Sequence, residues 1–115
     1  MHRFKDLEIW KQSRLCTDIY AVTSDFPDVE KFGLTNQLRR ASVSIPSNIA
    51  EGASRSSSKH FSRFLEIAIG SAYELETQLL ISSDLGFIGE QNLQKITLQL
   101  DSIIRMISRL RSTLK

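Results

Sequence analysis

The chain has 115 residues, of which 41% are hydrophobic and 24% are charged, and its formal net charge is +2 at pH 7. This length suits one domain with one core, so we predict a single domain over residues 1–115. The composition is that of a folded globular protein and excludes an intrinsically disordered chain. The mildly basic balance permits contact with nucleic acid but does not by itself argue for it.

The sequence gives no sign of a membrane segment or a metal site. No apolar run approaches the roughly 20 residues that span a bilayer, and the N-terminus carries charges where a signal peptide needs its apolar region. We therefore expect a cytoplasmic protein with no membrane partner. Cys16 is the only cysteine, so no intramolecular disulfide can form and a zinc site is not indicated. We expect no metal and no cofactor.

The first helix is expected to run from about Asp6 to Thr23, and its apolar residues fall on two nearly opposite sides. One side holds Leu7, Leu15, Ile19 and Val22, and the other holds Ile9, Cys16 and Tyr20. A helix in a monomeric bundle needs one apolar stripe, so the second stripe could bury against another subunit. Alternatively, these are single exposed apolar residues, which are common.

A second helix is predicted from Asn36 to about Ala53, with Thr35 as its N-cap. It follows a turn at residues 26–28. Pro46 lies inside this helix, where a proline removes one amide donor and costs an isolated helix roughly 3 kcal/mol. The helix could be kinked but continuous, or it could break and restart at Pro46. We favour the kink, because one apolar face stays in register across it: Leu38, Ala41, Ile45 and Ile49.

Two longer helices complete the chain. The third is predicted from a cap at Ser57 or Ser58 to Leu85, closed by Gly86, and the fourth from Gly89 to about Leu114. Each has one apolar face, and no strand pattern or internal repeat appears. We therefore predict an all-α fold, an antiparallel up-down-up-down four-helix bundle with a kink in the second helix at Pro46.

Polar residues interrupt the apolar faces of the second and third helices. Glu76 and Gln78 fall on the apolar side of the third helix, and a buried carboxylate is costly unless it is paired. An arginine of the second helix is a natural partner, so we predict a structural polar network. Its members are Arg39, Arg40, Asn48, Glu51 and Glu76. The alternatives are pairing across a subunit interface, catalysis, or a metal site, although the Glu-x-x-His signature of di-iron bundles is absent.

Cations recur at four-residue spacing on two helices. Arg55, Lys59 and Arg63 form a row if the third helix extends back to Arg55, and Arg105 and Arg109 form another in the fourth. Spaced cations can neutralise successive phosphates, so these five are candidate nucleic-acid-binding residues with weak sequence specificity. The other interpretation is an ordinary solvated helix surface. The aromatic residues largely sit on apolar faces, so nothing indicates a base-stacking platform.

Arg55 and His60 form an R-x4-H string that resembles the catalytic motif of the HEPN ribonucleases. Such chemistry would use His60 for proton transfer and Arg55 to neutralise phosphate charge. A single short match is nearly expected by chance in a chain with nine arginines, and the string lies far from the last helix, where the motif belongs. A ribonuclease is therefore the remote alternative.

Several longer motifs occur along nearly the whole chain. They are FKDLEIWKQS at Phe4 to Ser13, FGLTNQLRRASVSIPSNIAEG at Phe32 to Gly52, IAIGSAYELETQL at Ile67 to Leu79, and LGFI at Leu85 to Ile88. Together they resemble the four-helix-bundle protein family encoded in intervening sequences of bacterial 23S rRNA genes (S23 ribosomal protein-like). A related branch includes the accessory variability determinant of diversity-generating retroelements, a pentameric bundle that binds nucleic acid and works with a reverse transcriptase. The resemblance implies a homopentamer with no established catalytic activity.

The resemblance and the two basic rows together lead to one expected function. We expect a non-enzymatic, oligomeric bacterial protein whose basic surface contacts RNA or DNA, as an adaptor to a reverse transcriptase or another nucleic-acid protein. The alternative is a protein-interaction scaffold with no nucleic-acid role, which the second apolar stripe and the modest net charge favour.

Overall fold

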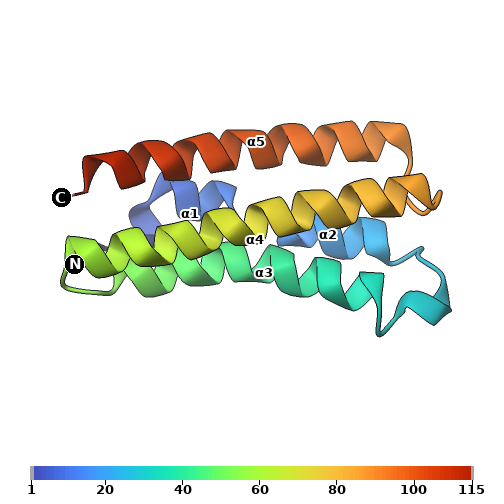
Figure 1. Ribbon diagram of the computed structural model, residues 1–115, viewed down its shortest axis with the longest axis horizontal. Coiled ribbons are helices and arrows are strands. Elements are labelled where there is room, and N and C mark those ends of the chain that lie inside the picture. The colour runs from blue at the N-terminus through green and yellow to red at the C-terminus, as the bar shows by residue number, and fades with distance from the viewer. Residues whose placement is uncertain (1, 115) are drawn as a thin grey trace.

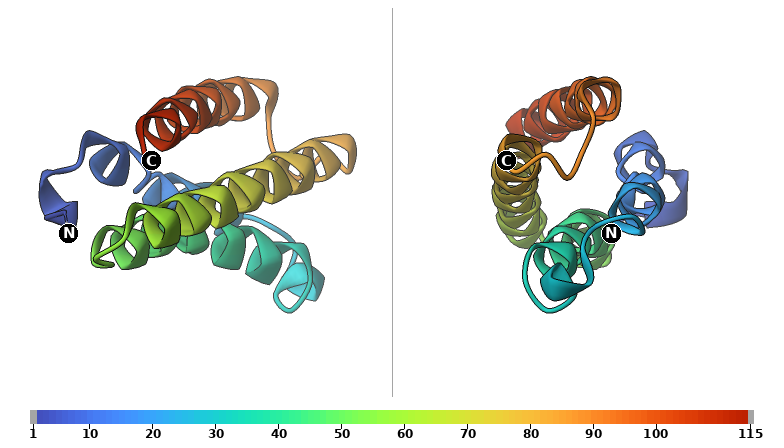
Figure 2. Two further views of the ribbon diagram at one scale, coloured as in Figure 1. Left: turned by 60° about the vertical axis from the view of Figure 1, so that its left-hand side comes forward. Right: turned by 90° about the vertical axis from the view of Figure 1, so that its right-hand side faces the viewer.

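A computed structural model describes residues 2–114 of the chain, and these residues form helices joined by short connections. The elements are the 3-10 helices η1 (Phe4–Asp6) and η2 (Asp28–Glu30), and the α-helices α1 (Glu8–Gln12), α2 (Cys16–Thr23), α3 (Leu34–Ala53), α4 (Ser58–Asp84) and α5 (Glu90–Thr113). The described residues contain no strand, so the all-α prediction is confirmed. Consecutive long helices run in opposite directions along the 44 Å axis of the molecule (Figure 1). Seen end-on, α3, α4, α5 and the α1–α2 pair occupy four corners (Figure 2).

The first predicted helix is divided into α1 and α2 at residues 13–15. Ser13 is fully buried there, and its Oγ donates a hydrogen bond to the Trp10 carbonyl at 2.8 Å. Because the helix is interrupted, Ile9 lies in the core at 6% exposure, whereas Tyr20 is 48% exposed. The predicted second apolar stripe of Ile9, Cys16 and Tyr20 is therefore wrong, since a helical period cannot be extended across a break.

The start of α3 differs from the predicted start by two residues. The helix begins at Leu34, and the Leu34 amide donates to Glu30 Oε1 at 3.1 Å. A carboxylate from η2 therefore caps α3 in place of the predicted Thr35 hydroxyl, and its negative charge suits the positive end of the helix dipole. A Cβ at Gly33 would lie 2.8 Å from that carboxylate oxygen, so a larger residue there would displace the Glu30 side chain from its capping position.

The α3 helix is continuous through Pro46, so the alternative of a break and restart at that residue is excluded. The kink stays a prediction. Hydroxyl groups around the proline bond to backbone and to α4: Ser42 Oγ donates to the Arg39 carbonyl at 2.9 Å, and Ser44 Oγ lies 2.8 Å from Ser71 Oγ. Asn48 Nδ2 donates to the Ser44 carbonyl at 2.8 Å. These polar side chains therefore have partners inside the packed helices.

The two ends of α4 match the predicted caps. Ser57 Oγ accepts a hydrogen bond from the His60 amide at 3.1 Å, which is the predicted N-cap. At the other end Gly86 has φ +78°, and the Phe87 amide donates to the Ser82 carbonyl at 2.9 Å. This is a Schellman motif, which requires a left-handed residue where the sequence has glycine.

The apolar faces predicted for the three long helices form the core. Its largest fully buried side chains include Leu38, Ile45, Ile49, Phe61, Leu65, Leu75, Leu79, Ile96, Leu100, Ile103 and Ile107. Burial of each such side chain contributes about 1.5–3 kcal/mol. At one end α3 and α4 approach so closely that a Cβ at Gly52 would lie 2.6 Å from Phe64 Cβ. None of the helices within residues 2–114 is long and apolar enough to cross a membrane.

Candidate nucleic-acid interface

Charged side chains are divided unequally between the two halves of the molecule. We divide the molecule near the midpoints of α3, α4 and α5, which run in alternating directions (Figure 1). The half that contains the α3–α4 turn then consists of residues 2–14, 44–70 and 102–114. It carries ten Lys or Arg and four Asp or Glu, a net charge of +6. The other half, residues 15–43 and 71–101, carries four Lys or Arg and nine Asp or Glu, a net charge of −5. We call them the basic half and the acidic half.

A cross-helix ion pair joins the last turns of α5 to the first turns of α4 inside the basic half. Arg111 Nε donates to Ser62 Oγ at 3.1 Å, and Arg111 Nη2 lies 3.0 Å from Glu66 Oε2. Both charged side chains are about half exposed, so the pair contributes at most about 1 kcal/mol. The pair shows that the last turns of α5 lie beside the first turns of α4, so the two predicted rows of cations are at the same end of the molecule.

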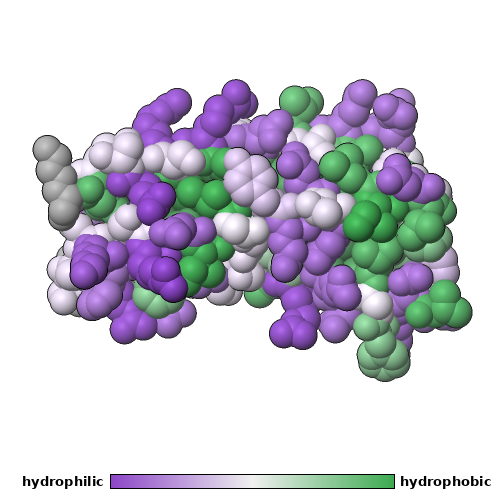
Figure 3. Space-filling model, in the orientation of Figure 1, coloured by the Kyte–Doolittle hydropathy of each residue, from purple (hydrophilic) through white to green (hydrophobic). Residues whose placement is uncertain are grey.

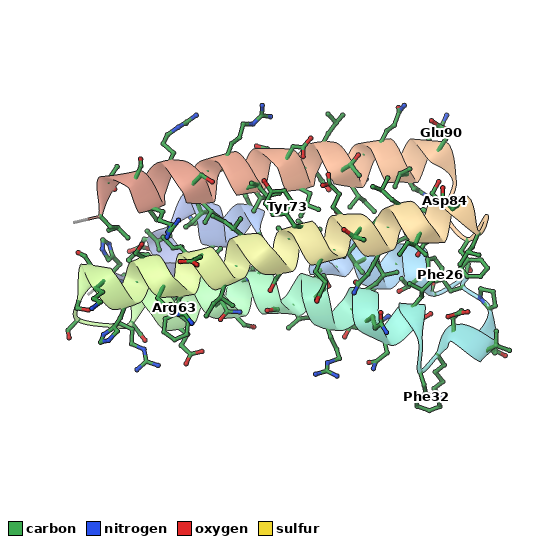
Figure 4. The ribbon with its side chains drawn as sticks, viewed as in Figure 1. Phe26, Phe32, Arg63, Tyr73, Asp84 and Glu90 are labelled. Carbon is green, nitrogen blue, oxygen red and sulfur yellow. The ribbon has the colours of Figure 1, made fainter. Side chains whose placement is uncertain are left out.

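The five predicted nucleic-acid-binding residues all lie in the basic half and are exposed: Arg55, Lys59, Arg63, Arg105 and Arg109. Lys59 and Arg63 are one turn apart on α4, where Figure 4 labels Arg63 near the α3–α4 turn. Arg105 and Arg109 are one turn apart on α5. Within residues 2–114, none of these four has a carboxylate in ion-pair contact, so their charges are available to a ligand.

Arg55 does not extend the helical row, because α4 begins only at Ser58. It lies in the preceding turn, where its Nη2 is 3.0 Å from Glu51 Oε1 and its guanidinium lies over the Phe64 ring, 5.1 Å from the centroid. The predicted three-residue row is therefore reduced to Lys59 and Arg63. No hydrogen bond among the described residues links Arg55 to His60, the other member of the ribonuclease-like string.

Exposed apolar side chains lie almost entirely in the acidic half. Figure 3 shows hydrophilic groups over most of the visible basic end and hydrophobic groups gathered towards the α4–α5 turn. The large apolar residues exposed in the acidic half are Tyr20, Val29, Phe32, Val43, Tyr73, Leu80, Ile81, Leu85 and Leu98, against Ile67 in the basic half. A surface with many cations and little exposed apolar area is better suited to bind a phosphate backbone than to form the apolar core of a protein–protein interface.

The predicted polar network does not form as one cluster in the described residues. Arg39 Nε donates to Thr23 Oγ1 at 2.9 Å, and its guanidinium lies 4.5 Å from the Tyr20 ring centroid. Arg40 is exposed on the outer side of α3. Neither arginine pairs with Glu76, so that part of the prediction is corrected: the arginine pair contacts α2 and solvent.

The position of Glu76 on α4 explains why the pair is absent. Ser71 faces α3, as its contact with Ser44 shows. Glu76 is five residues further along, which turns it about 140° around the helix at 3.6 residues per turn. It is half-buried on the flank away from α3. Gln78, the other predicted anomaly, does lie on the α3 side, and its Oε1 is buried without a hydrogen-bond partner in residues 2–114.

The described residues offer no metal centre, since no group of three His, Cys, Asp or Glu side chains among them could hold an ion. A family model described as 23S rRNA-intervening sequence protein matches residues 5–109. No curated protein sequence matches the chain.

Proposed function

The chain belongs to the family of 23S rRNA-intervening sequence proteins, and we propose that it is a non-enzymatic, oligomeric protein that binds the phosphate backbone of RNA or DNA. The basic half is the binding surface, and the acidic half faces away from the nucleic acid. The observation that carries this proposal is the segregation of charge, +6 against −5, over the two halves.

Screening makes the two halves electrically independent. The Debye length is about 8 Å at physiological ionic strength, whereas the molecule is 44 Å long. A phosphate at the basic end therefore interacts with the cations close to it rather than with the net charge of the chain. Residues four apart on a helix rise by about 6 Å, so Lys59 with Arg63, and Arg105 with Arg109, present cations at regular spacing to a backbone that needs no base-specific contact.

The family and the exposed apolar residues on α4 and α5, namely Tyr73, Leu80, Ile81 and Leu98, support an assembly of several copies. We propose a homopentamer of antiparallel up-down-up-down bundles, each kinked at Pro46, located in the cytoplasm. Five basic halves in one assembly strengthen backbone binding by multivalency. In this role the protein is an adaptor that brings nucleic acid to a nucleic-acid enzyme, such as a reverse transcriptase.

The proposal is tested with purified chain freed of bound nucleic acid, titrated with RNA, single-stranded DNA and duplex DNA at several salt concentrations. We expect the double variant Lys59→Glu, Arg63→Glu to lose affinity by about tenfold or more at low salt, with a shallower salt dependence, because each phosphate contact contributes about 0.7–0.9 to the logarithmic slope. The single variant Lys95→Glu places the same kind of change in the acidic half and is the control. Equal losses in the two proteins would contradict a binding surface confined to the basic half.

A protein-interaction scaffold is the second candidate. The stripe that first suggested it does not exist, but the exposed apolar residues of the acidic half favour it independently. Under this alternative the chain binds nucleic acid no better than an inert protein of equal charge, and a specific protein partner survives nuclease treatment in a pull-down.

A further inference from the structure

A groove of about 700 Å³ lies in the acidic half, between α2, the connection after η2, and the first turns of α3. Its lining includes Tyr20, Lys31, Phe32, Arg39, Arg40 and Val43. The volume is within the roughly 300–1,000 Å³ of clefts that bind small ligands. None of these residues belongs to the proposed phosphate-binding surface.

The groove is a local concentration of positive charge in an acidic surrounding. Lys31, Arg39 and Arg40 are three of the four cations of the acidic half. Arg39 is held in place by its hydrogen bond to Thr23 and its stacking on Tyr20. Arg40 and Lys31 are exposed, and among residues 2–114 neither is in ion-pair contact with a carboxylate. The groove therefore presents three cations. Arg39 is held by contacts with α2, whereas Arg40 and Lys31 extend into solvent.

Apolar side chains lie between these cations and are open to solvent. Phe32 is 87% exposed, with Lys31 Nζ 5.6 Å from its ring centroid, and Figure 4 shows the ring projecting from the body of the molecule. Val43 is 40% exposed. Covering an exposed phenylalanine with another apolar group contributes about 1.5–3 kcal/mol, so this ring is an energetically favourable contact for a partner.

We infer that the groove docks a short acidic segment of a partner protein, in which one or two carboxylates flank an aromatic or aliphatic side chain. The carboxylates bind Arg40 and Lys31, and the apolar side chain covers Phe32 and Val43. This inference states which kind of protein segment the proposed adaptor binds, and it rests on the proposed adaptor role. Arginine and aromatic residues are also those that dominate the energetics of protein interfaces.

The charges around the groove favour a short acidic peptide over a nucleic acid. Asp28 and Glu30 precede Lys31, and the adjoining groove, which shares Arg40, is lined by Glu74. A nucleic acid carries phosphates continuously, so those outside the groove would meet these carboxylates within the roughly 8 Å screening distance. A peptide can end its negative charge within the groove and continue with neutral residues.

The test begins with random dodecapeptides displayed on phage and selected on the purified full chain. Selected peptides are synthesised with a fluorescent label and titrated against wild type, Arg40→Glu and Phe32→Ser. The matched controls are Lys95→Glu and Leu98→Ser, which make the same kinds of change in the acidic half outside the groove. All four positions are exposed, Leu98 at 69%, and thermal melting verifies that each variant is folded.

We expect the selected peptides to combine Asp or Glu with a neighbouring aromatic or aliphatic residue. Each groove variant weakens their binding by about tenfold or more, and each control by less than about twofold. Selected peptides without carboxylates, or equal losses in the controls, overturn the inference. It is also overturned if a single-stranded oligonucleotide displaces the peptides and itself requires Arg40, or if Arg40→Glu lowers the oligomer mass in light scattering, which would assign the groove to another copy.

The failure of this inference is distinguishable from failure of the proposed function. RNA binding is measured on the same variants, and Arg40→Glu is expected to leave it within about twofold of wild type. If RNA binding is intact but acidic peptides are not selected, the inference about the docking groove is wrong and the proposed function is unaffected. Lost RNA binding in Lys59→Glu, Arg63→Glu with unchanged peptide binding assigns the two ligands to opposite halves.

Discussion

The basic and acidic halves are built from the same helices, yet they present different surfaces to solvent. The basic half has a net charge of +6, and Ile67 is its exposed large apolar side chain. The acidic half has a net charge of −5 and exposes the other large apolar side chains, among them Phe32 and Leu98. On α4 and α5 the exposed charges change from mostly acidic to mostly basic near the middle of the helix, whereas α3 carries Arg39 and Arg40 in the acidic half and Glu51 in the basic half. The two local charges sum to +1, and Lys115, which lies outside the described residues, brings the chain to +2. This small net charge describes neither surface.

The largest expected effect tests whether the two halves share one folding unit. Leu65 in the basic half and Leu79 in the acidic half are both fully buried on α4. We expect Leu65→Ala and Leu79→Ala each to lower the free energy of unfolding by about 2–5 kcal/mol, in a single transition, because each leaves a cavity in one continuous core. Urea unfolding followed by circular dichroism measures this. Two separate transitions in either variant would show that the halves are independent.

A smaller effect is expected at the close helix contact of the basic half. Gly52→Val would place side-chain atoms against Phe64 and Phe61, since even a Cβ meets Phe64 Cβ at 2.6 Å. We expect a loss of about 1–3 kcal/mol in the free energy of unfolding, from overpacking. Gly70→Ala is the control, because its Cβ meets no atom within 4 Å, and it is expected to stabilise the helix by about 0.5–1 kcal/mol. Similar destabilisation by both changes would contradict a specific contact at Gly52.

The two ends of α4 allow a direct comparison between the halves. Ser57→Ala in the basic half removes the hydrogen bond to the His60 amide, and Gly86→Ala in the acidic half forces an L-residue to φ +78°. Each is expected to cost about 1 kcal/mol in thermal unfolding. The two caps of α4 are then expected to contribute equally to stability. A loss confined to one variant would identify the half in which α4 frays first.

The smallest effect is expected at Glu76, in the acidic half. Glu76 has no ion pair or hydrogen bond from its side chain within residues 2–114, so we expect Glu76→Gln to change the free energy of unfolding by less than about 0.5 kcal/mol. Chemical denaturation against wild type measures it. A loss of several kcal/mol would restore the buried ion pair that the sequence pattern first indicated.

The long helices were predictable because their apolar residues repeat with one period over many turns, so the faces holding Leu38, Leu75 and Ile103 are those found in the core. The caps at Ser57 and Gly86 were predictable because their residue types match a local hydrogen-bonding requirement. The division of the first helix at residues 13–15 was not, since neither glycine nor proline marks it. There the burial of Ser13 and Leu15 stabilises the fold more than the backbone hydrogen bonds of a continuous helix would.

The candidate site was predictable only in part. The cations of both rows are recognisable from four-residue spacing, but their arrival at one end depends on the antiparallel packing of α4 and α5. The error at Glu76 arose because an apolar pattern gives a face and not the neighbour that covers it. The groove at Phe32 was not predicted, because its lining comes from α2, the connection after η2 and α3, and only tertiary structure brings these together and leaves the Phe32 ring in solvent.

The contact at Gly52 has a consequence for how the basic surface can change. The distance between α3 and α4 at this end is set by atoms next to the backbone, since Phe64 Cβ occupies the space that a side chain on Gly52 would need. Replacing a lysine or arginine on the outer face therefore alters the charge presented there without moving the hairpin that carries it. The charge of this end of the protein can therefore be changed by surface substitutions alone, while the spacing of the two helices is kept.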